Sequence, residues 1–202
     1  KNSSCLPISQ REEQWAAQLP RLRSREFRHT RGHARNVIGN IFNLPPLEVP
    51  LEAKPGQPPH LGEDWGYVSF SHCRDALLIG WSPKQLGVDL ERSDRSFAAS
   101  SLMRRYFSLE ECKAFLPLQE EALRAAVLDQ WIIKEAAIKW QKGSLARDFS
   151  HWQLCWNREP SKLVHQLLGH ELDFRCFSYS SWRIALVCEL PGLLEEPILC
   201  AE

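Results

Sequence analysis

Three acidic residues and one lysine stand in two short runs of this sequence, and their spacing could assemble a cation site. In the first run, apolar and acidic residues alternate, so a β-strand there would direct Asp89 and Glu91 to one face. About forty residues later, helical spacing puts Glu135 and Lys139 one turn apart on the same face. Magnesium prefers oxygen ligands and often bridges carboxylates and substrate phosphates. These residues therefore predict a site for a hard cation beside a phosphate.

The same four residues also have a purely structural interpretation. Asp89 and Glu91 could lie on the solvent face of an edge strand, while Glu135 pairs with Lys139 across a helical turn. Taken alone, the two runs leave both interpretations open.

Basic side chains elsewhere could bind further phosphate groups. Residues 21–35 contain six arginines and one acid, Glu26; the arginines are Arg21, Arg23, Arg25, Arg28, Arg31 and Arg35. His72 follows a Phe-Ser pair at a predicted hairpin bend, where an imidazole could donate to a phosphate. A solvated helix face and an ordinary turn residue would explain these features as well.

Hydrophobic periodicity and turn signals predict the elements that must position these residues. Helices are expected over 11–43, 98–106, 109–115 and 120–141, and strands over 67–71, 76–82, 87–91, 152–156, 171–179 and 182–189. Ser108 and Glu111 have the spacing of a capping box. Prolines and glycines dominate 44–66, which predicts a loop with one short strand. The order of elements indicates an α+β fold.

Composition restricts the class of protein. The 202 residues include 25 Lys plus Arg and 25 Asp plus Glu, so no overall charge favours nucleic acid. The seven cysteines are scattered without zinc-type spacing, which indicates reduced thiols in the cytoplasm. No run approaches the eighteen or so apolar residues that span a membrane. We expect a soluble intracellular protein.

The two runs together resemble the paired motifs of the 4′-phosphopantetheinyl transferases. The runs are Gly87-Val88-Asp89-Leu90-Glu91 and Trp131-x-x-Lys134-Glu135-Ala136-x-x-Lys139, with Phe70-Ser71-His72 ahead of the first and Phe107-Ser108-x-x-Glu111 between them. The resemblance covers about residues 20–145. It is to the large two-lobed type typified by the surfactin synthetase activator, and most of all to cyanobacterial members of the heterocyst-associated branch.

This resemblance implies two pseudo-symmetric α+β lobes, each a small, mainly antiparallel sheet packed with a long helix, and a cofactor cleft between them. We expect an N-terminal lobe over 1–83 that binds the adenosine and 3′-phosphate end of coenzyme A. A C-terminal lobe over 84–202 would hold the metal, the pyrophosphate and the carrier protein.

The family's site residues can be placed on matching positions of this chain. Asp89, Glu91 and Glu135 would bind Mg²⁺, with Mn²⁺ as the alternative. Lys139 would contact the pyrophosphate, and Asp89, Glu135 and Lys139 would form the catalytic group. The coenzyme contacts implied by the resemblance are Arg23, Arg35, Gly56, Gln57, Pro58, Ser71, His72 and Lys139.

One position departs from the family pattern. Members often carry Gly-Lys-Pro about sixteen residues ahead of the histidine, and here Gln57 takes the place of the lysine. Glutamine keeps a hydrogen bond but not the charge. Coenzyme affinity would then depend more on Arg23 and Arg35, or on Lys54 nearby.

The implied reaction moves phosphopantetheine from coenzyme A to a serine of an apo acyl or peptidyl carrier protein and releases adenosine 3′,5′-bisphosphate. Alternatives are a metal-dependent hydrolase of nucleotides or coenzyme A, and a carrier-binding homologue without turnover. We expect a cytoplasmic monomer that binds neither nucleic acid nor membrane. Carriers are usually acidic, so candidates for their docking surface are apolar and basic residues: Met103, Arg104, Phe107, Leu116 and Leu118.

Overall fold

The structure is a computed structural model that describes residues 6–155 and 162–189. The chain divides into two compact units, Lys1–Val68 and Ser69–Glu202. The sequence placed the boundary fifteen residues later, between 83 and 84. The hairpin that follows Val68 falls in the second unit because its residues contact the strand that carries Asp89.

The first unit is mainly helical. It comprises α1 (Gln10–Ala17), α2 (Arg21–Phe42), the 3₁₀-helix η1 (Pro46–Glu48), β1 (Leu51–Glu52) and β2 (His60–Leu61). The single helix expected over 11–43 is wrong. Pro20 stands at the N-cap of α2 and separates it from α1, since proline cannot continue a helix. A capping box of Ser9 and Glu12 begins α1.

Within its described residues, the second unit combines a hairpin, a five-stranded sheet and four α-helices. Its elements are β3 (Tyr67–His72, which starts at the boundary), β4 (Leu77–Ser82), β5 (Leu86–Arg92), α3 (Ala99–Tyr106), α4 (Leu109–Phe115), α5 (Glu120–Gln141), α6 (Leu145–Asp148), the 3₁₀-helix η2 (Phe149–His151), β6 (Trp152–Cys155), β7 (Lys162–His165), β8 (Glu171–Tyr179) and β9 (Trp182–Cys188). The predicted α4 and α5 are confirmed at both ends. Strand β7 was not predicted, and residue 156 of the strand expected over 152–156 lies outside the described residues.

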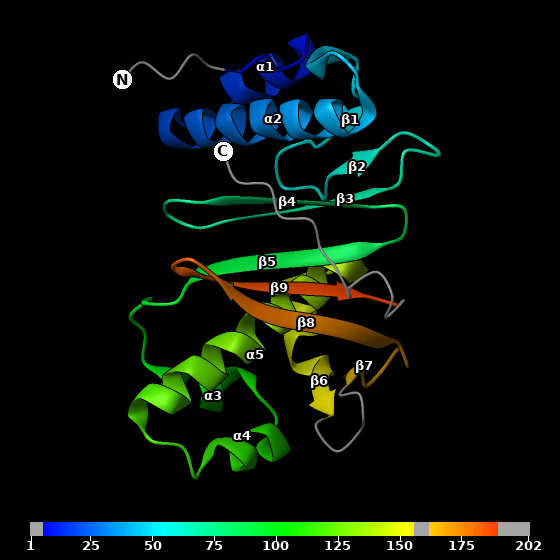
Figure 1. The fold of residues 1–202 in the computed structure, drawn as a ribbon. Helices are drawn as coiled ribbons and strands as arrows, with labels where there is room; N and C mark the ends of the chain where they lie inside the picture. Colours follow the sequence, from blue (N-terminus) through cyan, green and yellow to red (C-terminus); the bar gives the residue numbers. More distant parts are fainter. Residues whose placement is uncertain (1–5, 156–161, 190–202) are drawn as a thin grey trace. The chain divides into compact units, whose positions relative to one another are not determined.

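The larger sheet is antiparallel and has the order β5-β9-β8-β7-β6. Helix α5 packs against it, contacting β5, β9, β8 and β6 (Figure 1). Ten of the 22 residues of α5 are buried, which makes it the centre of the hydrophobic core. The α+β class and the small antiparallel sheets are therefore confirmed, and each unit carries one 22-residue helix.

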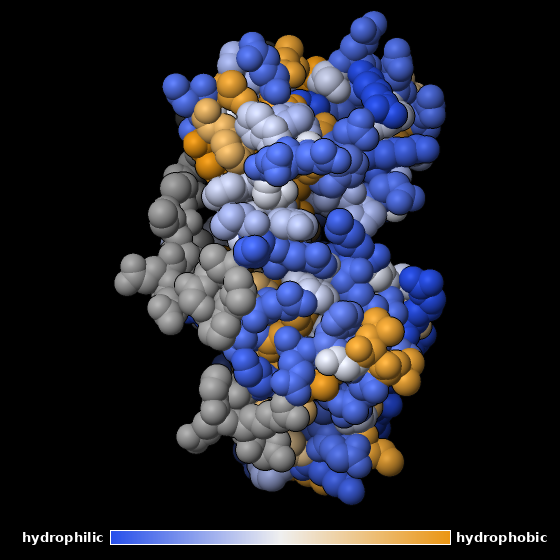
Figure 2. Space-filling view, turned by 90° about the vertical axis from the view of Figure 1, so that its right-hand side faces the viewer, coloured by the Kyte–Doolittle hydropathy of each residue, from blue (hydrophilic) through white to orange (hydrophobic). Residues whose placement is uncertain are grey.

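The surface in Figure 2 is mostly hydrophilic, and hydrophobic residues gather on this face in small separate groups. Among the described residues, no helix is both long and apolar enough to cross a bilayer. The described cysteines Cys73, Cys112, Cys155, Cys176 and Cys188 are free thiols.

Candidate functional site

Strand β5 presents its acidic residues to α5. Gly87 lies two residues before Asp89 on the same strand face, and a Cβ atom added there would overlap the carbonyl oxygen of Ala136 in α5. Val88 lies on the opposite face and packs towards Gly80 of β4. Glycine therefore permits helix and strand to approach closely at the point where the acidic face begins.

Asp89 is 3% exposed, although β5 is an edge strand of its sheet. Its Oδ1 accepts a hydrogen bond from the Ser71 hydroxyl at 2.7 Å and one from Lys139 Nζ at 2.6 Å. The structural interpretation of the motif is therefore wrong for Asp89, because the carboxylate faces protein rather than solvent. Lys139 reaches across to β5, where it forms this ion pair.

Glu91 and Glu135 complete the acidic group. Burial raises the pKa of Glu91, while Arg95, its ion-pair partner, opposes this rise. Burial also raises the pKa of Glu135 to about 7, and the negative charge of Asp89 adds to the effect. Lys139 opposes that second shift. Three carboxylates thus lie beside two basic side chains, Lys139 and Arg95.

The donors of this group suit a divalent cation, because Mg²⁺ and Mn²⁺ both bind carboxylate oxygen. Within 6–155 and 162–189, however, no set of three or more His, Cys, Asp or Glu side chains is arranged to hold a metal ion. Lys139 and Arg95 contact two of the three carboxylates instead. The donor chemistry fits, but a cation would have to replace these ion pairs.

The Phe-Ser-His element ends β3. Ser71 is buried against Asp89, whereas His72 is exposed at the last position of the strand. The alternation of a strand gives these neighbours opposite directions. His72 is accordingly accessible to a ligand, and Ser71 is engaged with the carboxylate.

Two arginines predicted to bind the coenzyme have different environments in the first unit. Arg23 is on the first turn of α2 with its side chain 71% exposed, 3.9 Å from Glu26. Arg35 is 3% exposed. It donates to the Glu12 carboxylate at 2.7 Å and to the carbonyl oxygens of Pro46, Val49 and Leu51. All three nitrogens of Arg35 are used within the unit, so a phosphate contact would require it to leave these partners.

Gly56, Gln57 and Pro58 are exposed in a turn after β1. The Gln57 N–H donates to the Lys54 carbonyl at 3.0 Å, and Gly56 has φ +76°. Proline before a glycine of positive φ is typical of a type II turn. The turn places the side-chain amide of Gln57 outside the core, where a ligand can reach it.

Lys134 has a function in the structure that the sequence did not reveal. It is 0% exposed, and its Nζ lies 2.7 Å from Glu111 Oε2. The other carboxylate oxygen of Glu111 accepts from Gln130 and from the Leu154 N–H. A lysine within the apolar run of α5 was the available signal, since such a residue must be buried with a partner.

The candidates for carrier docking fall into two groups. Met103 and Phe107 are buried in the core and are excluded as surface residues. Leu116 is 75% exposed, Leu118 is 36% exposed, and Arg104 is exposed on the last turn of α3. Phe107 follows the end of α3, and Leu116 and Leu118 follow the end of α4, so helical periodicity does not indicate which of these side chains are buried.

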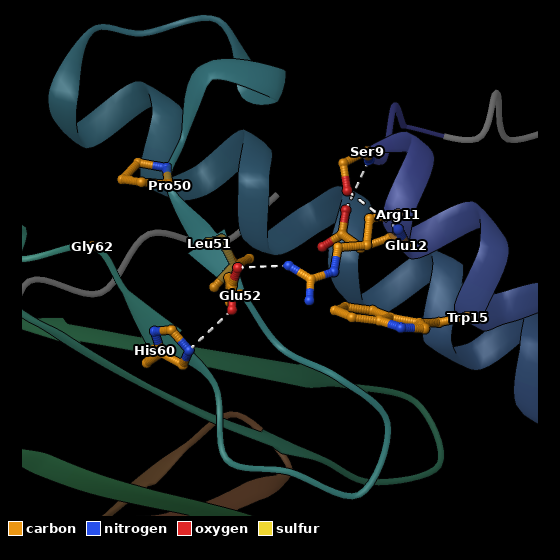
Figure 3. Close-up of a pocket in the computed structure, with 9 residues that line it drawn as sticks. All are labelled: Ser9, Arg11, Glu12, Trp15, Pro50, Leu51, Glu52, His60 and Gly62. Atoms are coloured by element: carbon orange, nitrogen blue, oxygen red, sulfur yellow. Dashed lines mark hydrogen bonds and ion pairs between the residues drawn. The ribbon is translucent and has the colours of Figure 1, made fainter.

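A pocket of about 510 Å³ lies between α1 and the β1–β2 hairpin (Figure 3). Its lining is Ser9, Arg11, Glu12, Trp15, Pro50, Leu51, Glu52, His60 and Gly62. Glu52 is ion-paired with Arg11 at 2.8 Å and lies 3.5 Å from His60, and the Arg11 guanidinium stands over the Trp15 ring. None of the predicted site residues lines this pocket.

The sheet, α5 and the acidic group lie in a segment with recognisable relatives. Residues 85–187 match the 4′-phosphopantetheinyl transferase superfamily, slightly more than half of the chain. The chain belongs to this superfamily. The matched segment contains Asp89, Glu91, Glu135 and Lys139, whereas the predicted coenzyme contacts before β4 lie outside it.

A curated relative is the 4′-phosphopantetheinyl transferase HetI of Nostoc sp.. It is 26% identical over 120 residues, which cover 57% of this chain and 51% of the relative. The chain thus spans about half the length of the curated relative that it matches. The resemblance to cyanobacterial members of the family is confirmed.

Proposed function

We propose that this protein transfers the 4′-phosphopantetheine group of coenzyme A to a serine of an apo carrier protein and releases adenosine 3′,5′-bisphosphate. The observation that carries the proposal is the acidic group between β5 and α5, where Asp89 meets Lys139 at 2.6 Å beside Glu135. Membership of the superfamily and the similarity to HetI support it.

Phosphoryl transfer depends on positioning and on neutralising charge at the pyrophosphate. Asp89, Glu91 and Glu135 would hold a divalent cation, Mg²⁺ or Mn²⁺, which supplies positive charge when bound. Lys139 would exchange its contact with Asp89 for one with a phosphate oxygen. This exchange frees a carboxylate oxygen and brings the ammonium to the group that needs it.

The serine of the carrier must lose a proton during transfer. Glu135 is the candidate acceptor, directly or through a water molecule, because burial and Asp89 raise the pKa of its carboxyl to about 7. A cation bound to the same carboxylate would lower that pKa. For this reason we favour the route through water.

The coenzyme and the carrier would use residues outside the acidic group. Arg23, His72 and the amide of Gln57 are exposed and can donate to phosphate or nucleotide groups. The carrier would dock on the apolar side chains of Leu116 and Leu118 with Arg104 opposite its acidic surface. We further propose that the protein acts as a cytoplasmic monomer.

The test incubates the protein with an apo carrier, coenzyme A and Mg²⁺ and follows the carrier by mass spectrometry. Wild type should add one phosphopantetheine to serine, and chelation of the metal should stop the addition. Asp89→Asn and Glu135→Gln should lower the rate at least a hundredfold. Glu121→Gln, on the exposed first turn of α5, is the matched control and should keep the wild-type rate.

Two outcomes would contradict the proposal. If Asp89→Asn converted the apo carrier as completely and as fast as wild type, Asp89 would not hold the cation. Cleavage of coenzyme A without any gain in mass of the carrier would indicate the hydrolase instead. A panel of apo carriers from fatty-acid, polyketide and peptide synthesis would then define the substrate.

A further inference from the structure

Two serines of β3 face β5. Ser69 and Ser71 are alternate residues of the strand and are 5% and 4% exposed. The Val88 N–H donates to the Ser69 hydroxyl at 3.1 Å, and the Ser71 hydroxyl donates to Asp89 Oδ1 at 2.7 Å. Strand β3 pairs with β4, and β5 is an edge strand of the larger sheet. Side-chain hydroxyls therefore make these contacts between β3 and β5.

The contacts of Asp89 distinguish its two oxygens. Oδ1 accepts both the Ser71 hydroxyl and the Lys139 ammonium. Oδ2 accepts no hydrogen bond from the side chains and backbone that the structure describes. Two donors on one oxygen fix the rotation of the carboxylate, because each bond prefers the plane of its lone pairs. Lys139 can move to a phosphate, but Ser71 stays on its buried strand.

The hydroxyl proton of Ser71 is committed in this arrangement. A serine has one O–H donor, and a coenzyme phosphate offers only acceptors. While Ser71 donates to Asp89, it has no proton for the coenzyme. The coenzyme contact that the sequence resemblance implied for Ser71 therefore competes with the bond in the structure.

We propose that Ser71 is a positioning residue that orients Asp89 towards a divalent cation, and that it does not bind coenzyme A directly. The proposal rests on the proposed function, because it assigns Asp89 to the cation. It predicts that Ser71 affects coenzyme binding only when the metal is present.

The test measures coenzyme A binding by titration calorimetry, once with chelator and once with Mg²⁺. Ser71→Ala should leave the metal-free affinity within twofold of wild type and reduce the gain on adding Mg²⁺ roughly tenfold, as expected for a lost hydrogen bond to a charged group. Ser71→Thr keeps the hydroxyl and should restore the gain. In an Asp89→Asn background, Ser71→Ala should have no further effect.

Ser69→Ala is the matched control, because it removes a hydroxyl of equal burial from the same face of β3. It should lower the thermal midpoint about as much as Ser71→Ala but leave the Mg²⁺ gain unchanged. If Mg²⁺ increased the coenzyme A affinity of Ser71→Ala as much as that of wild type, the proposal would be overturned. If Ser71→Ala bound coenzyme A more weakly than wild type without metal, Ser71 would contact the coenzyme directly, and the proposal would be wrong.

These readouts are independent of the transfer reaction. A wild-type protein that binds coenzyme A with Mg²⁺ but modifies no carrier would contradict the proposed function. The comparison of Ser71→Ala with wild type would still test the role of Ser71 in that case. A wild-type protein whose coenzyme binding ignores Mg²⁺ would overturn the proposal for Ser71, because Asp89 would then hold no cation.

Discussion

The buried ammonium of Lys134 donates to the carboxylate of Glu111, in the first turn of α4, at 2.7 Å. Glu111 also completes the capping box with Ser108. The Lys134 ammonium stands over the Phe107 and Phe149 rings, 4.8 and 5.3 Å from their centroids. The pair joins α4 to α5, and helical spacing puts Lys134 about 140° around α5 from Lys139, the residue that contacts Asp89.

Lys134→Met should destabilise the protein by about 3–5 kcal/mol, because it leaves the Glu111 carboxylate buried without its cation. The double variant Glu111→Leu with Lys134→Met should recover part of this loss, since it removes both charges from the core. Urea denaturation gives both free energies of unfolding.

Lys113→Met is the control, an exposed lysine of α4 whose loss should change stability by no more than about 0.5 kcal/mol. If Lys134→Met were as stable as this control, the buried pair would contribute nothing to the fold.

The sequence predicted features that depend on neighbours along the chain. The capping box of Ser108 and Glu111 and both ends of α5 are of this kind. The partner of Lys134 lies 23 residues away on another helix, so periodicity places the lysine but not Glu111. Sequence patterns predict which face of an element is buried but not what it meets.

Arg35 shows the same limit in the candidate site. Its place in a run of arginines suggested a phosphate contact, yet Glu12 and three carbonyl oxygens occupy its guanidinium. The spacing of the arginines along the helix does not reveal which of them are buried, because a buried and an exposed arginine can occupy the same helical stripe. For the acidic residues, the alternation with apolar neighbours put Asp89 and Glu91 on one face of β5 but left open whether that face met solvent or protein.

Arg23 and Arg35 should therefore respond differently to substitution. Arg35→Ala should cost about 3 kcal/mol of stability or more, because it leaves Glu12 and the carbonyl groups buried without a donor. Arg23→Ala should change stability by no more than about 0.5 kcal/mol but weaken coenzyme A binding about threefold to tenfold. Denaturant titration and calorimetry measure the two effects.

Leu22→Ala, at an exposed apolar residue beside Arg23, serves as the control and should alter neither property. A stable, fully folded Arg35→Ala protein that has lost coenzyme affinity would assign the phosphate contact to Arg35 after all.

Gly87→Ala should separate α5 from β5, because the added methyl group overlaps the Ala136 carbonyl oxygen. We expect a loss of about 1–3 kcal/mol from overpacking and a smaller Mg²⁺-dependent gain in coenzyme affinity. The second effect follows because Asp89 and Lys139 would no longer meet at 2.6 Å. Urea denaturation and titration calorimetry provide the measurements.

Gly169→Ala is a control of similar cost for a different reason. Gly169 has φ +69° in the β7–β8 turn, and nothing lies within 4 Å of the added methyl group. Backbone strain should cost about 1–2 kcal/mol there without changing coenzyme binding. Equal coenzyme binding by both variants and wild type would show that the approach of α5 to Gly87 does not govern the site.

His165 is the buried histidine of the second unit, at 2% exposure. Its Nδ1 accepts hydrogen bonds from the N–H groups of Leu167 at 3.3 Å and Leu168 at 3.1 Å, which places the proton of the neutral ring on Nε2. Burial lowers the pKa of His165 below 6.5, His151 and His170 lower it further, and Asp148 opposes them. A second proton would remove the acceptor of the β7–β8 turn.

Stability should therefore depend on pH through His165. Because the pKa is lower in the folded state, the unfolded chain binds more protons, and this contribution is present above about pH 6.5 and lost as the pH falls through the folded pKa. His165→Asn keeps an acceptor but does not titrate. Its urea midpoint should approach or pass that of wild type between pH 7.5 and 5, whereas exposed His60→Asn should follow wild type throughout. Parallel pH profiles of wild type and His165→Asn would refute the assignment.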